Sequence, residues 1–160
     1  MHQLTRPIFC LTLLLAPDTA WAQARQQNVV FNGFVSDACI LEVRDGELTL
    51  SQDFKQMGSE EAGGLSADLL VNSSGMPPQI QFGIPTLTIS PTRFVPERVE
   101  IAYNSENGFL QTYTSLPTVV DERTWMDHFR VNARIWQPIG FPVGNYQVVT
   151  VVTCTVPISG

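Results

Sequence analysis

Two cysteines sit near opposite ends of the chain, and each lies in a stretch where apolar side chains recur at every second position. Leu41 and Val43 share the alternation with Cys39, and Val152 and Val156 share it with Cys154. Strand side chains alternate between two faces, so both sulfur atoms are expected on the more apolar face of their strands. The pattern predicts a disulfide that joins the first and last strands of a β-sandwich.

The first 24 residues have the order of a secretory signal peptide. Arg6 provides a positive charge, residues 8–16 form an apolar run, and residues 22–24 (Ala-Gln-Ala) provide a small-residue cleavage position, with 20–22 as a competing site. The apolar run is too short to cross a bilayer as a helix. We therefore expect an exported protein whose mature part is soluble once released.

Residues 25–160 are expected to fold as one β-sandwich domain, because this length supports a single core. Cys10 falls within the signal peptide, so its removal leaves two cysteines in an oxidising compartment, where an even number favours a bridge. The formal net charge is −6, and Lys55 is the one lysine. An acidic, lysine-poor surface argues against nucleic acid and anionic membranes as partners.

Short alternating patterns, separated by turn residues, predict an all-β sandwich of seven to nine strands. A hairpin is expected after residues 45–46 (Asp-Gly) into residues 47–50, followed by a loop over 52–64. Helical character is limited to one turn near 51–57 and to residues 121–128. The other expected strands cover residues 28–43, 65–71, 79–82, 86–89, 99–103, 109–113, 129–135 and 146–156.

The sequence offers little for catalysis or metal binding. His128 is the one histidine after residue 24 and is adjacent to Asp127, but neighbours in sequence do not make a triad, and no Gly-x-Ser-x-Gly motif occurs. The distant cysteines lack the paired spacing of a zinc site. The carboxylate pairs at 60–61 and 121–122 are typical of solvated loops. We expect no enzyme activity, no cofactor and no metal.

Both ends of the chain resemble one protein family. Phe31-x-Gly33-x-Val35 followed by Cys39 resembles the start of chaperone–usher fimbrial subunits, and the sequence from Gly144 to Tyr146 resembles the opening of their closing strand. The Cys-Thr-Val-Pro at residues 154–157 is similar to the invasin-type tip subunits of afimbrial adhesins. Ordinary rod pilins instead place their second cysteine near the end of the next strand, and residues 69–80 contain none.

The resemblance covers about forty residues, and it implies an immunoglobulin-like, pilin-type sandwich that lacks its final strand. A periplasmic chaperone would fill the resulting groove, and at an outer-membrane usher the N-terminal extension of a neighbouring fimbrial subunit would replace it by β-strand addition. The protein would pass through the periplasm to the cell surface and mediate attachment there. The residues expected to border the groove are Tyr146, Val148, Val152 and Val156.

The segment before Cys39 has two interpretations. Val29, Phe31, Gly33 and Val35 either plug a neighbour's groove as a donor strand or belong to the subunit's own first strand. Residues 25–38 reach at most about 46 Å, which is short for both tasks together. If no donor remains, the protein accepts a strand and gives none, which is the tip role that we prefer.

Other function classes stay open at this stage. A complete sandwich would need no partner strand and would act as a stand-alone secreted or periplasmic binding protein. A tip subunit could hold a host receptor through Tyr113, Trp125 or Trp136, although each of these aromatic residues is more typical of a core.

Overall fold

The computed structural model describes residue 32, residues 38–90 and residues 95–157. The chain divides into Met1–Gly33 and Phe34–Gly160, and all the described strands lie in the second unit. The described residues form twelve strands and no helix, so the predicted all-β class is confirmed. The signal peptide and the segment carrying Val29, Phe31, Gly33 and Val35 lie outside the described residues.

The twelve strands exceed the seven to nine expected because short strands occur in predicted loops and one long predicted strand is divided. They are β1 (Ala38–Arg44), β2 (Thr49–Leu50), β3 (Gln56–Gly58), β4 (Ala67–Ser74), β5 (Gln79–Phe82), β6 (Thr86–Ser90), β7 (Arg98–Ser105), β8 (Leu110–Thr114), β9 (Thr118–Asp121), β10 (Met126–Trp136), β11 (Asn145–Val149) and β12 (Val152–Thr155).

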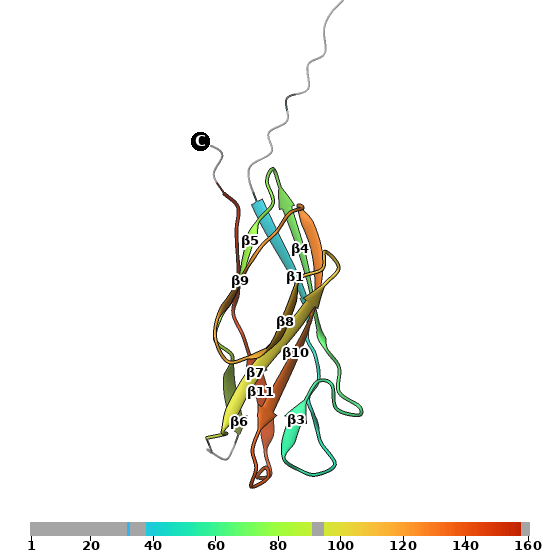
Figure 1. Ribbon diagram of the computed structural model, residues 1–160, viewed down its shortest axis with the longest axis vertical. Coiled ribbons are helices and arrows are strands. Elements are labelled where there is room, and N and C mark those ends of the chain that lie inside the picture. The colour runs from blue at the N-terminus through green and yellow to red at the C-terminus, as the bar shows by residue number, and fades with distance from the viewer. Residues whose placement is uncertain (1–31, 33–37, 91–94, 158–160) are drawn as a thin grey trace, which may run out of the picture. The chain divides into compact units, whose positions relative to one another are not determined.

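The first sheet is antiparallel and is built around β10. Its main order is β1-β4-β10-β7, with β8 beyond β7. β3 pairs with the C-terminal end of β10, and β2 pairs with β3. Figure 1 shows β1 beside β4, at one edge of this sheet. β1 is therefore an edge strand whose only partner among the described strands is β4.

The second layer contains the order β12-β5-β9, and β11 pairs with β6. The single strand predicted over residues 146–156 is wrong: it is interrupted between β11 and β12, where Thr150 Oγ1 donates a hydrogen bond to the Gly83 carbonyl. The partner strand is interrupted at the same level by Gly83 and Pro85, and a proline cannot donate to a ladder. The Gly83 N–H instead donates to Val151 O at 2.8 Å.

The core lies between the two layers. Phe82 of the second layer stacks on Tyr103 of the first, with ring centroids 4.2 Å apart, and Phe129 meets both rings edge-on. Phe82 and Phe129 are fully buried, and Leu69, Val71, Ile80, Ile101 and Val120 complete the buried cluster. Aromatic pairs in these geometries add to the stabilisation from burial alone. The sandwich prediction is thereby confirmed.

Three local predictions were wrong. Residues 45–50 form no hairpin with β1: Glu47 forms a bridge with Leu65, and β2 pairs with β3. The segment 51–57 contains turns and a strand rather than a helical turn. Residues 121–128 are not helical, because Met126 already begins β10 and pairs with β4. For β3 and β10, pairing with a strand distant in sequence overrode the local pattern.

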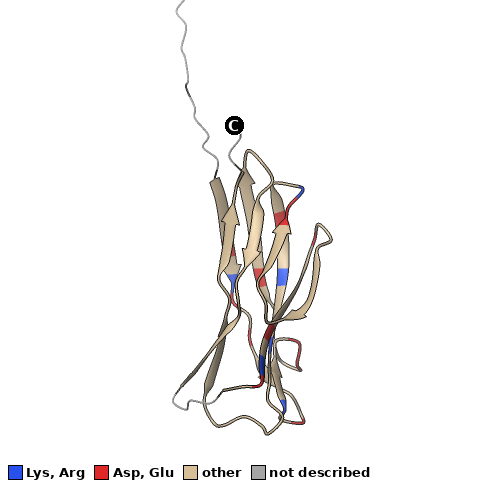
Figure 2. Cartoon of the chain, turned by 60° about the vertical axis from the view of Figure 1, so that its left-hand side comes forward, with Lys and Arg blue, Asp and Glu red and all other residues tan. Residues whose placement is uncertain are grey.

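A polar network holds the loop before β4 against the outer face of β10. Asn132 Oδ1 accepts hydrogen bonds from the hydroxyls of Ser59 and Ser66, at 3.0 and 2.5 Å, and Ser59 Oγ accepts the Ala133 N–H. Charged residues are otherwise spread over several strands and loops, as Figure 2 shows. Within the described residues, no helix has the length and apolar character needed to cross a membrane.

Candidate strand-binding groove

The two sheets are joined at one end by a disulfide. Cys39 on β1 and Cys154 on β12 are bonded, with their Cα atoms 6.1 Å apart, which lies in the usual range for a bridge. The predicted pairing is therefore confirmed. Both strands lie at the edges of their sheets, so the bond joins two edges rather than two central strands.

Below this bond the two edges separate and leave a groove of about 530 Å³. One wall consists of Leu41 and Val43 on β1 with residues 45–48, and the other consists of β11 and the start of β12. The floor is apolar and belongs to the core of the sandwich: Leu69, Phe82, Ile101, Val131 and Ala133.

The wall formed by β11 and β12 has an unfinished inner face. From Asn145 to Pro157 every second residue is exposed, and the residues between them are half-buried, yet none of these inward side chains is fully buried. Strands that complete a core normally bury one face against it. The half-buried face consists of Tyr146, Val148, Thr150, Val152, Cys154 and Val156.

The opposite wall shows the same deficiency on β1. Cys39 and Leu41 are half-buried, but Val43, which shares their face, is 65% exposed. An apolar side chain of this size contributes about 1.5–3 kcal/mol when it becomes fully buried. The inward face of β1 would therefore gain further stabilisation if another segment covered Val43.

Backbone pairing is incomplete along both walls. β11 and β12 pair on one side, with β6 and β5, and no ladder joins them to β1 among residues 38–90 and 95–157. An exposed strand edge is a template for another strand. The groove therefore combines an apolar floor with two strand edges that face each other, which is the arrangement that an added strand would fill.

One end of the groove is acidic. The charged residues among those that line it are Asp45, Glu47 and Asp68. Asp68 lies 3.3 Å from His128 Nε2 and 3.9 Å from Arg44, whose side chain is largely exposed. A segment that enters from this end meets negative charge first, which favours a basic residue at that position of the segment.

The structure brings together most of the residues expected at the groove. Tyr146, Val148 and Val152 line it, whereas Val156 follows β12 and is half-buried beyond the disulfide. Thr150 lines the groove as well, although it was not among the expected site residues. Its place was readable from the alternation, because it lies two positions from both Val148 and Val152.

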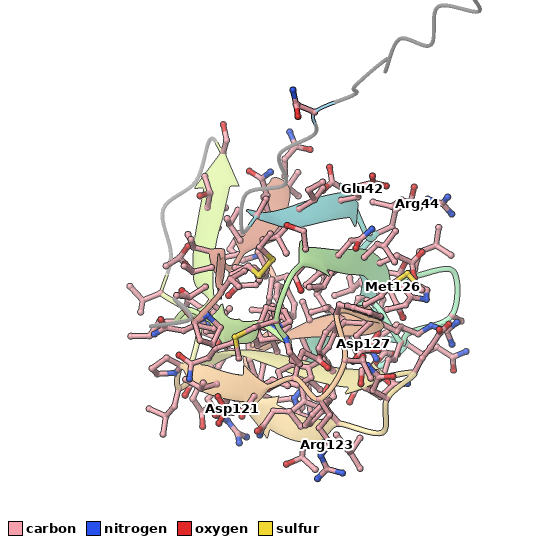
Figure 3. All side chains as sticks on the ribbon, turned by 90° about the horizontal axis from the view of Figure 1, so that it is seen from above. Glu42, Arg44, Asp121, Arg123, Met126 and Asp127 are labelled. Atoms are coloured by element: carbon pink, nitrogen blue, oxygen red, sulfur yellow. A yellow bond between two sulfur atoms is a disulfide. The ribbon has the colours of Figure 1, made fainter. Side chains whose placement is uncertain are left out.

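A second cluster was missed by the sequence interpretation. Glu122, expected in a solvated loop, is 8% exposed, and Asp127 is 3% exposed. Burial, together with the neighbouring carboxyl group of Asp127, raises the pKa of Glu122 to about 7. In Figure 3 Asp127 lies toward the middle of the view, whereas Asp121 and Arg123 lie at its periphery. The signal for this burial is tertiary, since nothing in the local sequence separates Glu122 from its exposed neighbour Asp121.

The remaining candidates show no catalytic arrangement among the described residues. His128 lies between Glu106 and Asp68, at 3.2 and 3.3 Å, and both of these partners are carboxylates rather than a nucleophile. The described residues contain no group of three side chains suited to hold a metal ion. Trp125 is 63% exposed, while Trp136 and Tyr113 are half-buried.

Comparison with known proteins gave no relative: no family model, no curated protein and no solved structure matches this chain.

Proposed function

We propose that this chain is an exported fimbrial or adhesin subunit that is completed by a β-strand from another protein. The groove between β1 and β11 carries the proposal, because it has an apolar floor and two strand edges without a shared partner in the described chain. Strand addition to such an edge derives its attraction from backbone hydrogen bonds and its selectivity from alternate side chains.

The strand order supports an immunoglobulin-like, pilin-type fold. In a constant-type immunoglobulin sandwich, strands A, B, E and D form one sheet and C, F and G form the other. The order β1-β4-β10-β7 corresponds to A-B-E-D, and β5 beside β12 corresponds to C-F. The described residues offer no counterpart of G, and the groove lies where G would pair with F.

The dimensions of the groove suit a short donor. The inward positions along its β11–β12 wall are residues 146, 148, 150 and 152, and they span six steps of about 3.3 Å, or about 20 Å. The disulfide joins the walls beyond this span, so a donor of about seven residues fits below it. The donor or first-strand candidates Val29, Phe31, Gly33 and Val35 have the same spacing.

In this proposal a periplasmic chaperone occupies the groove first. At an outer-membrane usher, the N-terminal extension of a neighbouring subunit then takes its place, and the assembled protein reaches the cell surface. We prefer the tip position, where the subunit accepts a strand and donates none. Of the three aromatic candidates for receptor contact, Trp125 is the exposed one, at 63%, and it lies beside Met126 at 57%.

Co-expression with a cognate chaperone tests this function. The chain should be retained on the chaperone as a one-to-one complex, and the complex should dissociate when a peptide with alternating apolar residues is added. The matched control is a peptide of the same composition with its apolar residues on both faces. A chain that stays soluble and monomeric alone, and that binds neither partner, would instead be a stand-alone exported binding protein.

A further inference from the structure

A buried carboxyl pair, Glu122 and Asp127, lies at the junction of three strand connections. Glu122 follows β9, and its N–H donates to Pro78 O, just before β5. Asp127 is the second residue of β10, and its side chain lies on the same face of the strand as that of the buried Phe129. The pair therefore lies at one end of the core, on strands other than those that form the groove walls.

One oxygen of each carboxyl group is already bonded. Asp127 Oδ1 accepts the N–H groups of Asn107 and His128, at 3.1 and 2.7 Å. Glu122 Oε2 accepts a hydrogen bond from the side-chain amide of Asn107 at 3.2 Å. Asn107 lies in the turn between β7 and β8, so both acids hold the same turn.

The other oxygen of each group has no donor. Glu122 Oε1 and Asp127 Oδ2 are buried and have no hydrogen-bond partner. Both carboxyl groups contact the same residue, Asn107, and Asp127 contributes to the raised pKa of Glu122, so the two groups are neighbours. Two carboxylates cannot donate to one another, and an unsatisfied buried charge is costly. One proton between them satisfies both oxygens at once.

We propose that Glu122 and Asp127 share a single proton, and that this proton clamps the Asn107 turn to the exposed Trp125–Met126 connection. The same amide of Asn107 also donates to Thr124 Oγ1 at 2.8 Å and to Met126 O at 3.0 Å, so the turn and the connection are held through one side chain. When the proton leaves, two negative charges face each other and this end of the sandwich loosens.

The groups around the pair set the direction of the pH dependence. Burial disfavours ionisation of Glu122, and the neighbouring Asp127 acts in the same direction. Asp121 and Arg123 flank Glu122 in the sequence, and Asp121 accepts a hydrogen bond from Gln79. On the turn side, Glu106 and His128 form an ion pair when the histidine is protonated. Asp68 contacts the other ring nitrogen of His128.

The sign of the effect follows from the raised pKa of Glu122. The folded chain retains a proton up to about pH 7, whereas an unfolded glutamate releases it near pH 4.5. The stabilisation is therefore complete below about pH 4.5 and is lost as the pH rises through 7. Retention of one proton changes the unfolding equilibrium constant by up to about tenfold per pH unit in that range.

Equilibrium unfolding of the full, disulfide-bonded chain between pH 5 and 8 tests the clamp. Glu122→Gln keeps a donor toward Asp127 but cannot ionise. The unfolding equilibrium constant of the variant should therefore lack the wild-type contribution of up to about tenfold per pH unit. Asp121→Asn is the matched control, since it removes the adjacent exposed carboxylate, and it should keep the wild-type dependence. Equal pH dependence of Glu122→Gln and wild type would overturn the proposal.

Two further measurements on the wild type keep the test decisive if the variant does not fold. The carboxyl carbon of Glu122, followed by NMR, should titrate near neutral pH, and titration in the ordinary range of an exposed glutamate would contradict the shared proton. Unfolding in the presence of calcium chloride or EDTA should be unchanged. Stabilisation by calcium would show that a cation, rather than a proton, occupies the space between the two acids.

Discussion

Cys39 and Cys154 tie the edge of one sheet to the edge of the other, 115 positions apart in the chain, at the level where the groove ends. The bond holds β1 and β12 together while leaving β1 and β11 apart. It therefore acts both as a staple for the sandwich and as one end of the space that an added strand would occupy.

Removal of the disulfide should destabilise the chain strongly. Closure of a loop of more than 100 residues contributes about 4–5 kcal/mol in the chain-entropy model. Cys39→Ser and Cys154→Ser should lower the free energy of unfolding by similar amounts, because each change breaks the same bond. Urea unfolding of both variants measures this. Clearly unequal losses would mean that the two sulfur atoms have separate roles.

A charge placed on the inner face of the groove should prevent strand addition. Val148 lies on the half-buried face of β11, so Val148→Lys would put an ammonium group where a donor side chain must pack. Binding of a donor peptide, measured by calorimetry, should fall by at least about tenfold, which corresponds to about 1.4 kcal/mol.

Thr153→Lys provides the control for that change. Thr153 lies on β12 but faces outward and is exposed. The variant adds the same charge to the same wall, so its affinity for the donor peptide should stay close to that of the wild type. If both variants bind the peptide equally well, the peptide does not occupy the groove.

Gly46 supports the acidic end of the groove through close backbone contact. A Cβ atom at this position would lie 2.5 Å from Leu65 O and 2.7 Å from Ala67 N, both of which are backbone atoms. Gly46→Ala should therefore displace the segment that lines the groove and cost about 1–3 kcal/mol of unfolding free energy. Gly58→Ala is the control: its Cβ would meet Ala133 O at 3.4 Å, an ordinary contact, and thermal unfolding should show a smaller loss.

The inward face of the closing strands was predictable because its alternation is uninterrupted. Residues 145–157 keep period two through the gap between β11 and β12, so Tyr146, Val148 and Val152 fall on the groove side as expected. The gap itself was not predictable from this segment. The gap lies opposite the interruption at Gly83 and Pro85 between β5 and β6. Local sequence does not show that β11 and β12 pair with these two strands.

The errors share a physical origin. The segment from Glu47 to Gly58 was read as a hairpin and a loop, but Glu47 forms an isolated bridge with Leu65, and β3 pairs with both β2 and the end of β10. Glu122 looked solvated beside Asp121, yet the fold of the β9–β10 connection buries one of the two and exposes the other. Such outcomes depend on contacts distant in sequence, which local patterns do not carry.

The most direct test of the account is hydrogen exchange along β11 and β12 with the groove empty and filled. A chain with about seven residues of alternating apolar and polar side chains fused after Gly160, through a flexible linker of about eight residues, supplies the donor. We expect slower amide exchange in residues 146–152 of the fusion and a higher free energy of unfolding, both abolished when the central apolar residue of the fused segment is changed to Asp. Unchanged exchange in that segment, or equal protection by the Asp-bearing donor, would contradict the account.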